Sequence, residues 1–190
     1  MTAHPSLRFV QKESPTENDC FDICFTYVFF IDYVDKNNGQ RNRLKYVGRA
    51  EKYDDVFAIK FYASRDRKSP HDKYSLAHGQ LGVKAVLNIF WNCIAIINDM
   101  SKFYPNCSFV FKGAEAYDPN TMRWEDENEN QRFRIYRTFL SKVIGTKTFT
   151  HYQYLKNSIY LLIRKESTTL DYIKRDRIMN MLYRRFNLSE

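Results

Sequence analysis

The feature that most constrains the fold is an apolar run from Val83 to Phe103, VKAVLNIFWNCIAIINDMSKF. On a helix its polar residues share one narrow strip, and these are Lys84, Asn88, Asn92 and Asp99. Nearly all the rest of the cylinder is apolar, which is typical of a helix buried in a protein core. The helix is expected to stop before Pro105, because the residue preceding a proline avoids helical backbone angles. Polar residues interrupt the whole run, which favours a core helix over a membrane span.

Segments rich in β-branched and aromatic residues predict strands on both sides of this helix. Residues 25–34 read FTYVFFIDYV and are apolar on both alternating faces. This pattern indicates an interior strand of a covered sheet, or a strand that carries aromatics for another purpose. Asn38 and Gly39 form a strong turn signal that predicts a hairpin. The remaining strands are expected at 44–50, 56–64, 74–82, 108–112, 149–155 and 158–164, and the remaining helices at 131–144 and 168–186.

This order of elements predicts an α+β fold. We expect a largely antiparallel sheet packed against a buried central helix (83–103) and two further helices. Residues 21–190 are expected to form one domain, and residues 1–20 a poorly ordered, polar N-terminal arm. An acidic loop is expected at 114–130, and a loop of this length is usually functional or mobile.

Positive charge is concentrated near the C-terminus. The chain has a formal net charge of +8. Residues 131–190 hold 13 Lys and Arg against 4 Asp and Glu, whereas the first 130 residues hold 17 against 18. Such asymmetry indicates a basic face directed at a polyanion or at an acidic protein partner.

The C-terminal segment therefore predicts a nucleic-acid interface. Cationic side chains neutralise phosphates and release counterions, and aromatic faces stack on unpaired bases. Because no helix-turn-helix or zinc-finger pattern occurs, RNA or single-stranded nucleic acid is favoured over duplex DNA. The residues expected to bind are Arg132, Arg134, Arg137, Lys142, Tyr152, Tyr154, Lys174, Arg177, Arg184 and Arg185. The ordinary alternative is a solvated basic surface with half-buried tyrosines.

The acidic loop supports a second hypothesis, a protein-binding inhibitor or adaptor that acts on a nucleic-acid-processing protein. Aromatic side chains are favoured anchors at protein interfaces. The residues expected to bind are Tyr117, Met122, Trp124, Glu125, Asp126 and Glu127. An anti-defence protein acting on an RNA-guided nuclease would fit this description. The simpler alternative is a loop that shields the protein's own basic face.

A metal-dependent nuclease is the third hypothesis. It would need clustered carboxylates, or a histidine pair with a lysine. The available groups are scattered along the chain and are Asp54, Asp55, His71, Asp72, His78 and His151. No phosphate-binding glycine loop and no metal-ligand spacing occurs, so we expect neither metal nor cofactor and favour a non-enzymatic protein.

Four cysteines and the N-terminal residues indicate the compartment. Cys20, Cys24, Cys93 and Cys107 match no disulfide or zinc framework, so we expect free thiols in a reducing environment. The first 19 residues have no apolar signal core and no acylation motif. The sequence thus predicts a cytoplasmic protein with no membrane contact. The basic 168–186 helix is expected to dock on the sheet, although anionic lipid would suit the same pattern.

Residues 56–140 resemble an uncharacterised domain of small Bacteroidota and phage proteins. The resemblance rests on Phe103-Tyr104-Pro105, on the strand 108–112 that ends at Gly113, and on Arg132, Arg134 and Tyr136. It implies a small cytoplasmic α+β domain carried by a mobile element, and no known activity. The order of four strands and a helix is also similar to the single-strand-binding PUR repeats, which is an analogy of fold alone.

Overall fold

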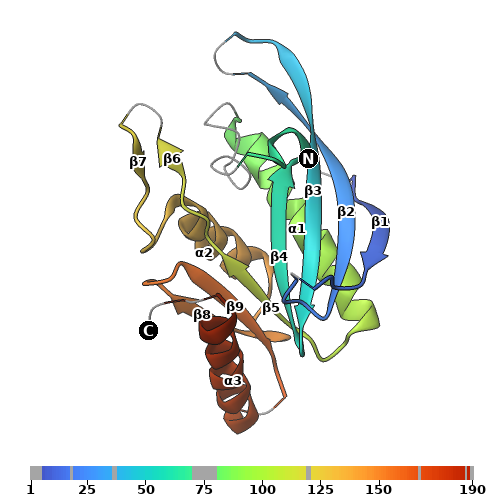
Figure 1. Cartoon of the computed structure of the whole chain (residues 1–190), viewed down its shortest axis with the longest axis vertical. Helices are drawn as coiled ribbons and strands as arrows, with labels where there is room; N and C mark the ends of the chain where they lie inside the picture. The colour runs from blue at the N-terminus through green and yellow to red at the C-terminus, as the bar shows by residue number, and fades with distance from the viewer. Residues whose placement is uncertain are drawn as a thin grey trace.

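A seven-stranded sheet forms the centre of the computed structural model, which describes residues 6–17, 19–35, 38–69, 81–118, 121–166, 168–186 and 188. The strand order β1-β2-β3-β4-β5-β9-β8 joins strands from both halves of the chain (Figure 1). Neighbouring strands are antiparallel except β4 and β5, which run parallel. The strands are β1 (Arg8–Glu13), β2 (Ile23–Val34), β3 (Arg41–Tyr53), β4 (Val56–Ala63), β5 (Ser108–Lys112), β8 (Phe149–Tyr154) and β9 (Ile159–Arg164).

Helices pack on both faces of this sheet. The helices α1 (Val83–Phe103) and α2 (Gln131–Val143) lie on one face, and α3 (Thr168–Phe186) lies on the other, against β9 and its neighbours (Figure 1). A short 3-10 helix, η1 (Ser64–Asp66), follows β4. The predicted α+β fold with a largely antiparallel sheet is confirmed, and the central helix spans the predicted residues.

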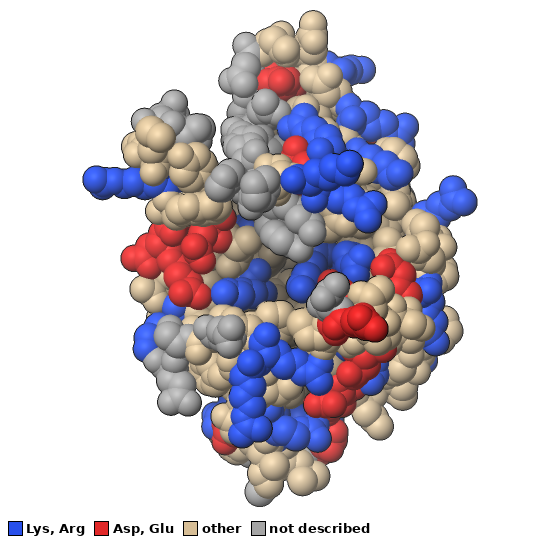
Figure 2. All heavy atoms as spheres, in the orientation of Figure 1, with Lys and Arg blue, Asp and Glu red and all other residues tan. Residues whose placement is uncertain are grey.

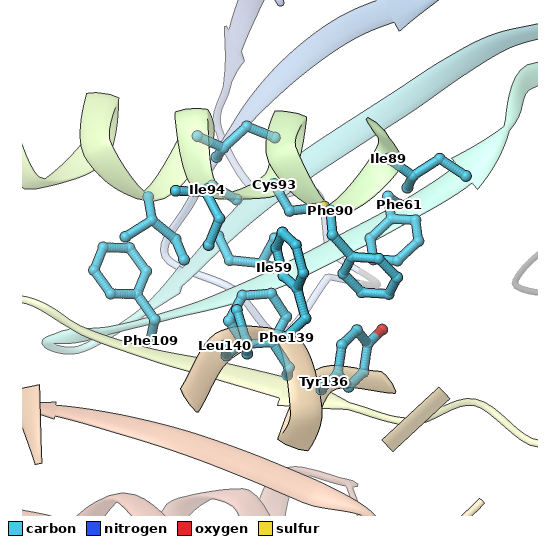
Figure 3. Close-up of a cluster of buried hydrophobic side chains, with 14 of the residues drawn as sticks. Ile59, Phe61, Ile89, Phe90, Cys93, Ile94, Phe109, Tyr136, Phe139 and Leu140 are labelled. Atoms are coloured by element: carbon cyan, nitrogen blue, oxygen red, sulfur yellow. The ribbon is translucent and has the colours of Figure 1, made fainter. Parts of the chain in front are cut away.

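The main core lies between the sheet and the pair α1 and α2. Phe90 of α1 is fully buried at its centre, with its ring centroid 5.7 Å from that of Phe61 on β4 (Figure 3). The same ring lies 5.4 Å from Tyr136 and 5.5 Å from Phe139, both on α2. One aromatic cluster therefore joins the sheet to both helices.

The polar strip of α1 is buried at one position, Asn92, whereas Lys84 is exposed and Asn88 and Asp99 are half-buried. Asn92 is only 2% exposed, and its side-chain amide donates to the carbonyl of Asn88 at 2.8 Å. Leu87 and Trp91 are exposed instead. A local hydrogen bond satisfies the buried amide, so the helix can turn this position inward.

Among the described residues, α1 is the one helix that is long and apolar enough to cross a membrane, so its polar residues alone do not exclude a span. Half of its apolar window is buried inside the protein, as in a core helix.

The prediction of a poorly ordered N-terminal arm is wrong for residues 8–13. They form the edge strand β1, antiparallel to β2, with a register shift between Phe9 and Gln11. All but one of its residues are exposed, so the strand lacks the apolar alternation by which strands are recognised. Main-chain pairing with β2 holds it to the sheet, together with contacts such as that of the Phe9 ring, whose centroid lies 5.5 Å from that of Tyr27.

The acidic loop at 114–130 contains a small hairpin of two strands, β6 (Tyr117–Asp118) and β7 (Arg123–Trp124), which projects from the end of β5 (Figure 1). Asn130 then caps α2 by accepting a hydrogen bond from the Phe133 amide at 3.0 Å. The strand expected at 74–82 lies largely outside the described residues.

Candidate nucleic-acid interface

On the face of the sheet opposite α1, α3 covers β2 to β4 only near the turn between β3 and β4, where Tyr53, Val56 and Ala58 belong to the cluster around α3. Strand residues alternate between the two faces, and the register of β1 to β4 places one set here. We call the residues of this set that are not buried the open strand face. They are Arg8, Gln11, Glu13, Thr26, Val28, Phe30, Asp32, Val34, Arg41, Arg43, Lys45, Val47, Arg49 and Lys60. The buried residues of the set are Cys24, Glu51, Tyr53, Val56, Ala58 and Tyr62.

A row of cations runs along β3 on this face. Arg41, Arg43 and Lys45 are exposed and occupy alternate positions, which places neighbours about 6.8 Å apart along the strand. Figure 2 shows Lys and Arg side chains gathered over this upper part of the sheet. The spacing suits successive phosphates of an extended single strand.

The cations of the open strand face differ in how strongly they are paired. Arg49 lies 3.1 Å from the carboxylate of Glu51 and 3.3 Å from that of Glu13. Burial raises the pKa of each carboxyl, but the Thr26 hydrogen bond to Glu13 and the Lys60 ammonium beside Glu51, with a smaller contribution from Arg49, lower both pKa values overall. Arg43 pairs with Asp32 at 3.4 Å, but both side chains remain mostly exposed. Exposed pairs of this kind contribute little to stability and are readily exchanged for a ligand anion.

Three other cations, Arg8, Arg41 and Lys45, have no hydrogen-bond or ion-pair partner within the part of the chain that the structure describes. Together they leave the open strand face with surplus positive charge that is available to phosphate.

Apolar side chains lie among these cations. Phe30 on β2 is 41% exposed, and the Arg43 guanidinium lies 4.7 Å from its ring centroid. Val28 and Val47 are directly opposite each other in the register and are half-buried. An exposed aromatic ring between cations can stack on an unpaired base while its neighbours bind the flanking phosphates.

The structure places the predicted Arg132 inside the protein. It is 5% exposed, its guanidinium donates to the Phe61 carbonyl at 3.3 Å, and it lies 4.4 Å from the Phe61 ring centroid. Its burial does not fit the expectation that it binds nucleic acid on a basic surface, because the first turn of α2 points this side chain toward β4.

The predicted Arg134 and Arg137 lie on the surface of α2 but are engaged by the acidic loop. Arg134 donates to the Glu129 carbonyl at 2.6 Å and lies 3.7 Å from the Glu125 carboxylate. Arg137 pairs with the Glu129 carboxylate. The loop therefore pairs with two cations of this helix, and the Arg134 side chain stays 55% exposed. Lys142 is exposed at the last turn of the helix.

The predicted Lys174 is also buried, at 8% exposure. Its ammonium donates to the Asn106 carbonyl at 2.9 Å and lies 3.0 Å from Glu166 and 3.4 Å from Asp55. Arg177 pairs with the same Asp55 at 2.6 Å. These two cations hold α3 against the turn between β3 and β4, so the expectation that Lys174 is surface-exposed is wrong.

The remaining cations predicted on α3 differ from each other. Arg185 hydrogen-bonds to the Cys20 carbonyl and lies 5.4 Å from the Tyr53 ring centroid, whereas Arg184 is exposed.

The predicted base-stacking residues Tyr152 and Tyr154 lie on β8 and are half-buried against α3. The Arg175 guanidinium lies 5.4 Å from the Tyr152 ring centroid and 5.2 Å from that of Tyr172. These tyrosines thus help to dock α3, which is the ordinary alternative to a base-binding role.

The β6–β7 hairpin exposes the residues predicted to bind a protein. Met122 is 77% exposed, and Trp124 is 48% exposed with its ring 5.3 Å from that of Tyr117. The acidic residues that follow are engaged within the protein, because Glu125 contacts Arg134, Glu127 lies 3.2 Å from Lys112, and Asp126 accepts from the Asn128 amide.

The carboxylates and histidines considered for catalysis are not brought together. Asp54 occupies a turn with positive φ, and the neighbouring Asp55 is paired with α3. His71, Asp72 and His78 lie outside the described residues. Elsewhere in the structure, no three His, Cys, Asp or Glu side chains could jointly hold a metal ion. Cys24, Cys93 and Cys107 are buried, and burial raises the pKa of each thiol.

His151 gives a testable pH dependence of stability. Its Nδ1 lies 2.7 Å from the Tyr160 hydroxyl, and burial, with Lys165 nearby, lowers its pKa below the ordinary 6.5. Below pH 6.5 the unfolded chain therefore takes up a proton before the folded protein does, and the free energy of unfolding falls. Urea unfolding at pH 7.5 and 5.5 should show a smaller decrease for His151→Gln than for the wild type. Equal decreases would contradict this assignment.

The sequence analysis missed the open strand face, although a signal for it existed. Residues 41–49 read RNRLKYVGR, with a cation at nearly every second position, which is the period of one face of a strand. Counting charge over the first 130 residues concealed this row, because 17 cations offset 18 carboxylates in that count.

Comparisons of the chain with protein-family models, with curated proteins and with solved structures found no match. The resemblance of residues 56–140 to the Bacteroidota and phage domain stays a prediction.

Proposed function

We propose that the protein binds RNA or single-stranded nucleic acid on the open strand face. The row Arg41, Arg43 and Lys45 beside the exposed Phe30 carries this proposal. Phosphates would lie along the cations, and unpaired bases would stack on the aromatic ring and cover the valines. This location replaces the 131–190 face expected from the sequence, where cations are largely buried or paired.

Single strands suit this surface better than a duplex does. The open strand face presents no helix that could enter a major groove, and unpaired bases supply the flat surfaces that an aromatic side chain can stack on. The role is that of a binding protein, acting alone or within a complex with a nucleic-acid-processing protein.

Fluorescence anisotropy with labelled single-stranded RNA, single-stranded DNA and duplex, each over a salt series, tests the proposal. Replacing Arg41 and Lys45 with alanine removes two phosphate contacts. We expect the slope of log affinity against log salt to fall by about 1.4, and affinity at 0.1 M salt to fall roughly 20-fold.

The matched control is Arg134→Ala with Arg137→Ala, which removes the same amount of charge from the paired surface of α2. We expect this variant to bind as the wild type does. Equal losses in both double variants would show that only overall charge matters and would overturn the assignment of the site.

A protein-binding adaptor is the second candidate, because the β6–β7 hairpin exposes Met122 and Trp124. Weak, salt-insensitive binding of the wild type to all three nucleic acids would reject the first proposal in favour of this one.

A further inference from the structure

The sheet divides beside the open strand face. The strands β4 and β5 pair only through Val56–Ala58 and Ser108–Val110, and β5 then continues toward the β6–β7 hairpin. A cleft of about 390 Å³ lies where they separate, between the hairpin and the last turns of α3. This volume is within the range of about 300–1,000 Å³ typical of small-molecule sites.

The cleft combines aromatic, apolar and cationic walls. Trp124 and Phe186 line it from the hairpin and from α3, and the buried Arg132 lines it from α2. Lys112 and Glu115 also line it, from the end of β5 and the residues after it. An apolar ligand alone would leave these charged groups desolvated without compensation, so the lining favours a ligand that is flat, partly apolar and anionic.

Lys60 connects the cleft to the open strand face. It lines the cleft, belongs to the open strand face through its pairing opposite Arg49, and lies 5.5 Å from the Phe186 ring centroid. Its ammonium is bound to the Glu51 carboxylate at 2.6 Å, which holds it at the boundary. A strand that follows the cations of β3 therefore reaches the mouth of the cleft.

We infer that the cleft receives one unpaired nucleotide of the strand bound on the open strand face. The base enters between Trp124 and Phe186. Its phosphate takes the place of Glu127, which lies 3.2 Å from the exposed Lys112 ammonium, while Lys60 stays bound to Glu51 at the mouth of the cleft. Arg132 offers donors and Glu115 an acceptor to the polar edge of the base. This inference rests on the proposed function. A free mononucleotide has the same base and phosphate groups, so it would be recognised by the same residues of the cleft.

Tryptophan fluorescence tests the inference directly. The chain has two tryptophans, so Trp91→Phe leaves Trp124 as the only reporter, on the wall of the cleft. Trp91 lies on α1, away from the cleft lining. We expect saturable quenching on titration with a single-stranded RNA oligonucleotide, and weaker, saturable quenching with adenosine monophosphate.

A filled cleft provides the matched comparison. Ala114 lines the cleft and is only half-buried, so Ala114→Phe should block entry without disturbing the core. In the Trp91→Phe background it should abolish quenching and lower strand affinity roughly tenfold, as expected for the loss of one stacked base. Ala116→Phe, two residues further along and outside the lining, should leave both measurements unchanged.

The outcomes separate this inference from the proposed function. Tight strand binding by anisotropy, with no change in Trp124 fluorescence and no effect of Ala114→Phe, would overturn the cleft and leave the open strand face in place. If no strand binds, the proposed function fails, and the titration with adenosine monophosphate then tests whether the cleft binds a nucleotide. Quenching that Ala114→Phe abolishes would support a nucleotide site in the cleft. The absence of quenching would overturn it.

Discussion

Replacing Phe90 with alanine is expected to lower the free energy of unfolding by about 3–5 kcal/mol, the usual cost of removing a buried phenylalanine ring. The ring is fully buried and contacts Phe61, Tyr136 and Phe139 (Figure 3). Its loss would remove contacts from the sheet and from both α1 and α2 together. Because rigid elements meet at this point, the surroundings can collapse only partly into the space that is left.

Urea unfolding monitored by circular dichroism would measure this change. Phe103→Ala is the matched control, because the same substitution on the same helix removes a ring that is 70% exposed. We expect the control to stay within about 0.5 kcal/mol of the wild type. A cost for Phe90→Ala as small as that of the control would mean that the ring does not join the sheet and the two helices.

Replacing Asn130 with alanine is expected to cost about 2–4 kcal/mol, a large effect for a polar residue, from the lost helix cap and the buried groups left unpaired. Its side-chain oxygen accepts from the Phe133 amide at 3.0 Å, and its side-chain nitrogen donates to the Gly113 carbonyl at 2.9 Å. The residue is 1% exposed, so water would not readily replace these partners. The side chain thus ties the start of α2 to the end of β5.

The same contact explains the glycine at position 113. A Cβ atom there would overlap the Asn130 side chain.

Thermal and urea unfolding of Asn130→Ala would measure the loss of stability. The matched control is Asn98→Ala, at an exposed position of α1. We expect the control to be nearly neutral, since alanine favours helices and no buried partner is lost. Equal stability of the two variants would contradict the capping role.

Asn130 also affects the cleft, because two residues near it line that cleft. The Gly113 carbonyl accepts a hydrogen bond from the Asn130 side chain, and Arg132 follows Asn130 two residues along the chain. If Asn130→Ala remains folded at low temperature, its strand affinity should fall toward that of Ala114→Phe. The open strand face, which lies on other strands, should keep its salt dependence.

Local patterns determined most of the secondary structure. The apolar period of residues 83–103 and the β-branched runs 25–34 and 56–64 led to elements at those places, because each pattern reflects burial of one side of a helix or strand. The strand β1 and the hairpin strands β6 and β7 escaped detection, since main-chain pairing forms them with little apolar burial.

The candidate site was harder to predict than the fold. Charge counts along the chain indicated residues 131–190, yet the tertiary structure buries Arg132 and Lys174 and brings Glu129 onto Arg137. Whether a cation is available to a ligand depends on which carboxylates and carbonyls lie near it in space, and those partners come from distant parts of the chain.

The sequence by itself determined most of the elements, the buried central helix and the α+β class, because these follow from the order of apolar and polar side chains along short segments. Only the tertiary structure decided which sheet face stays open, which cations remain unpaired and where β4 and β5 separate to form a cleft. These properties depend on contacts between residues far apart in the chain, such as Arg132 with Phe61 and Lys174 with Asp55, that no local pattern encodes.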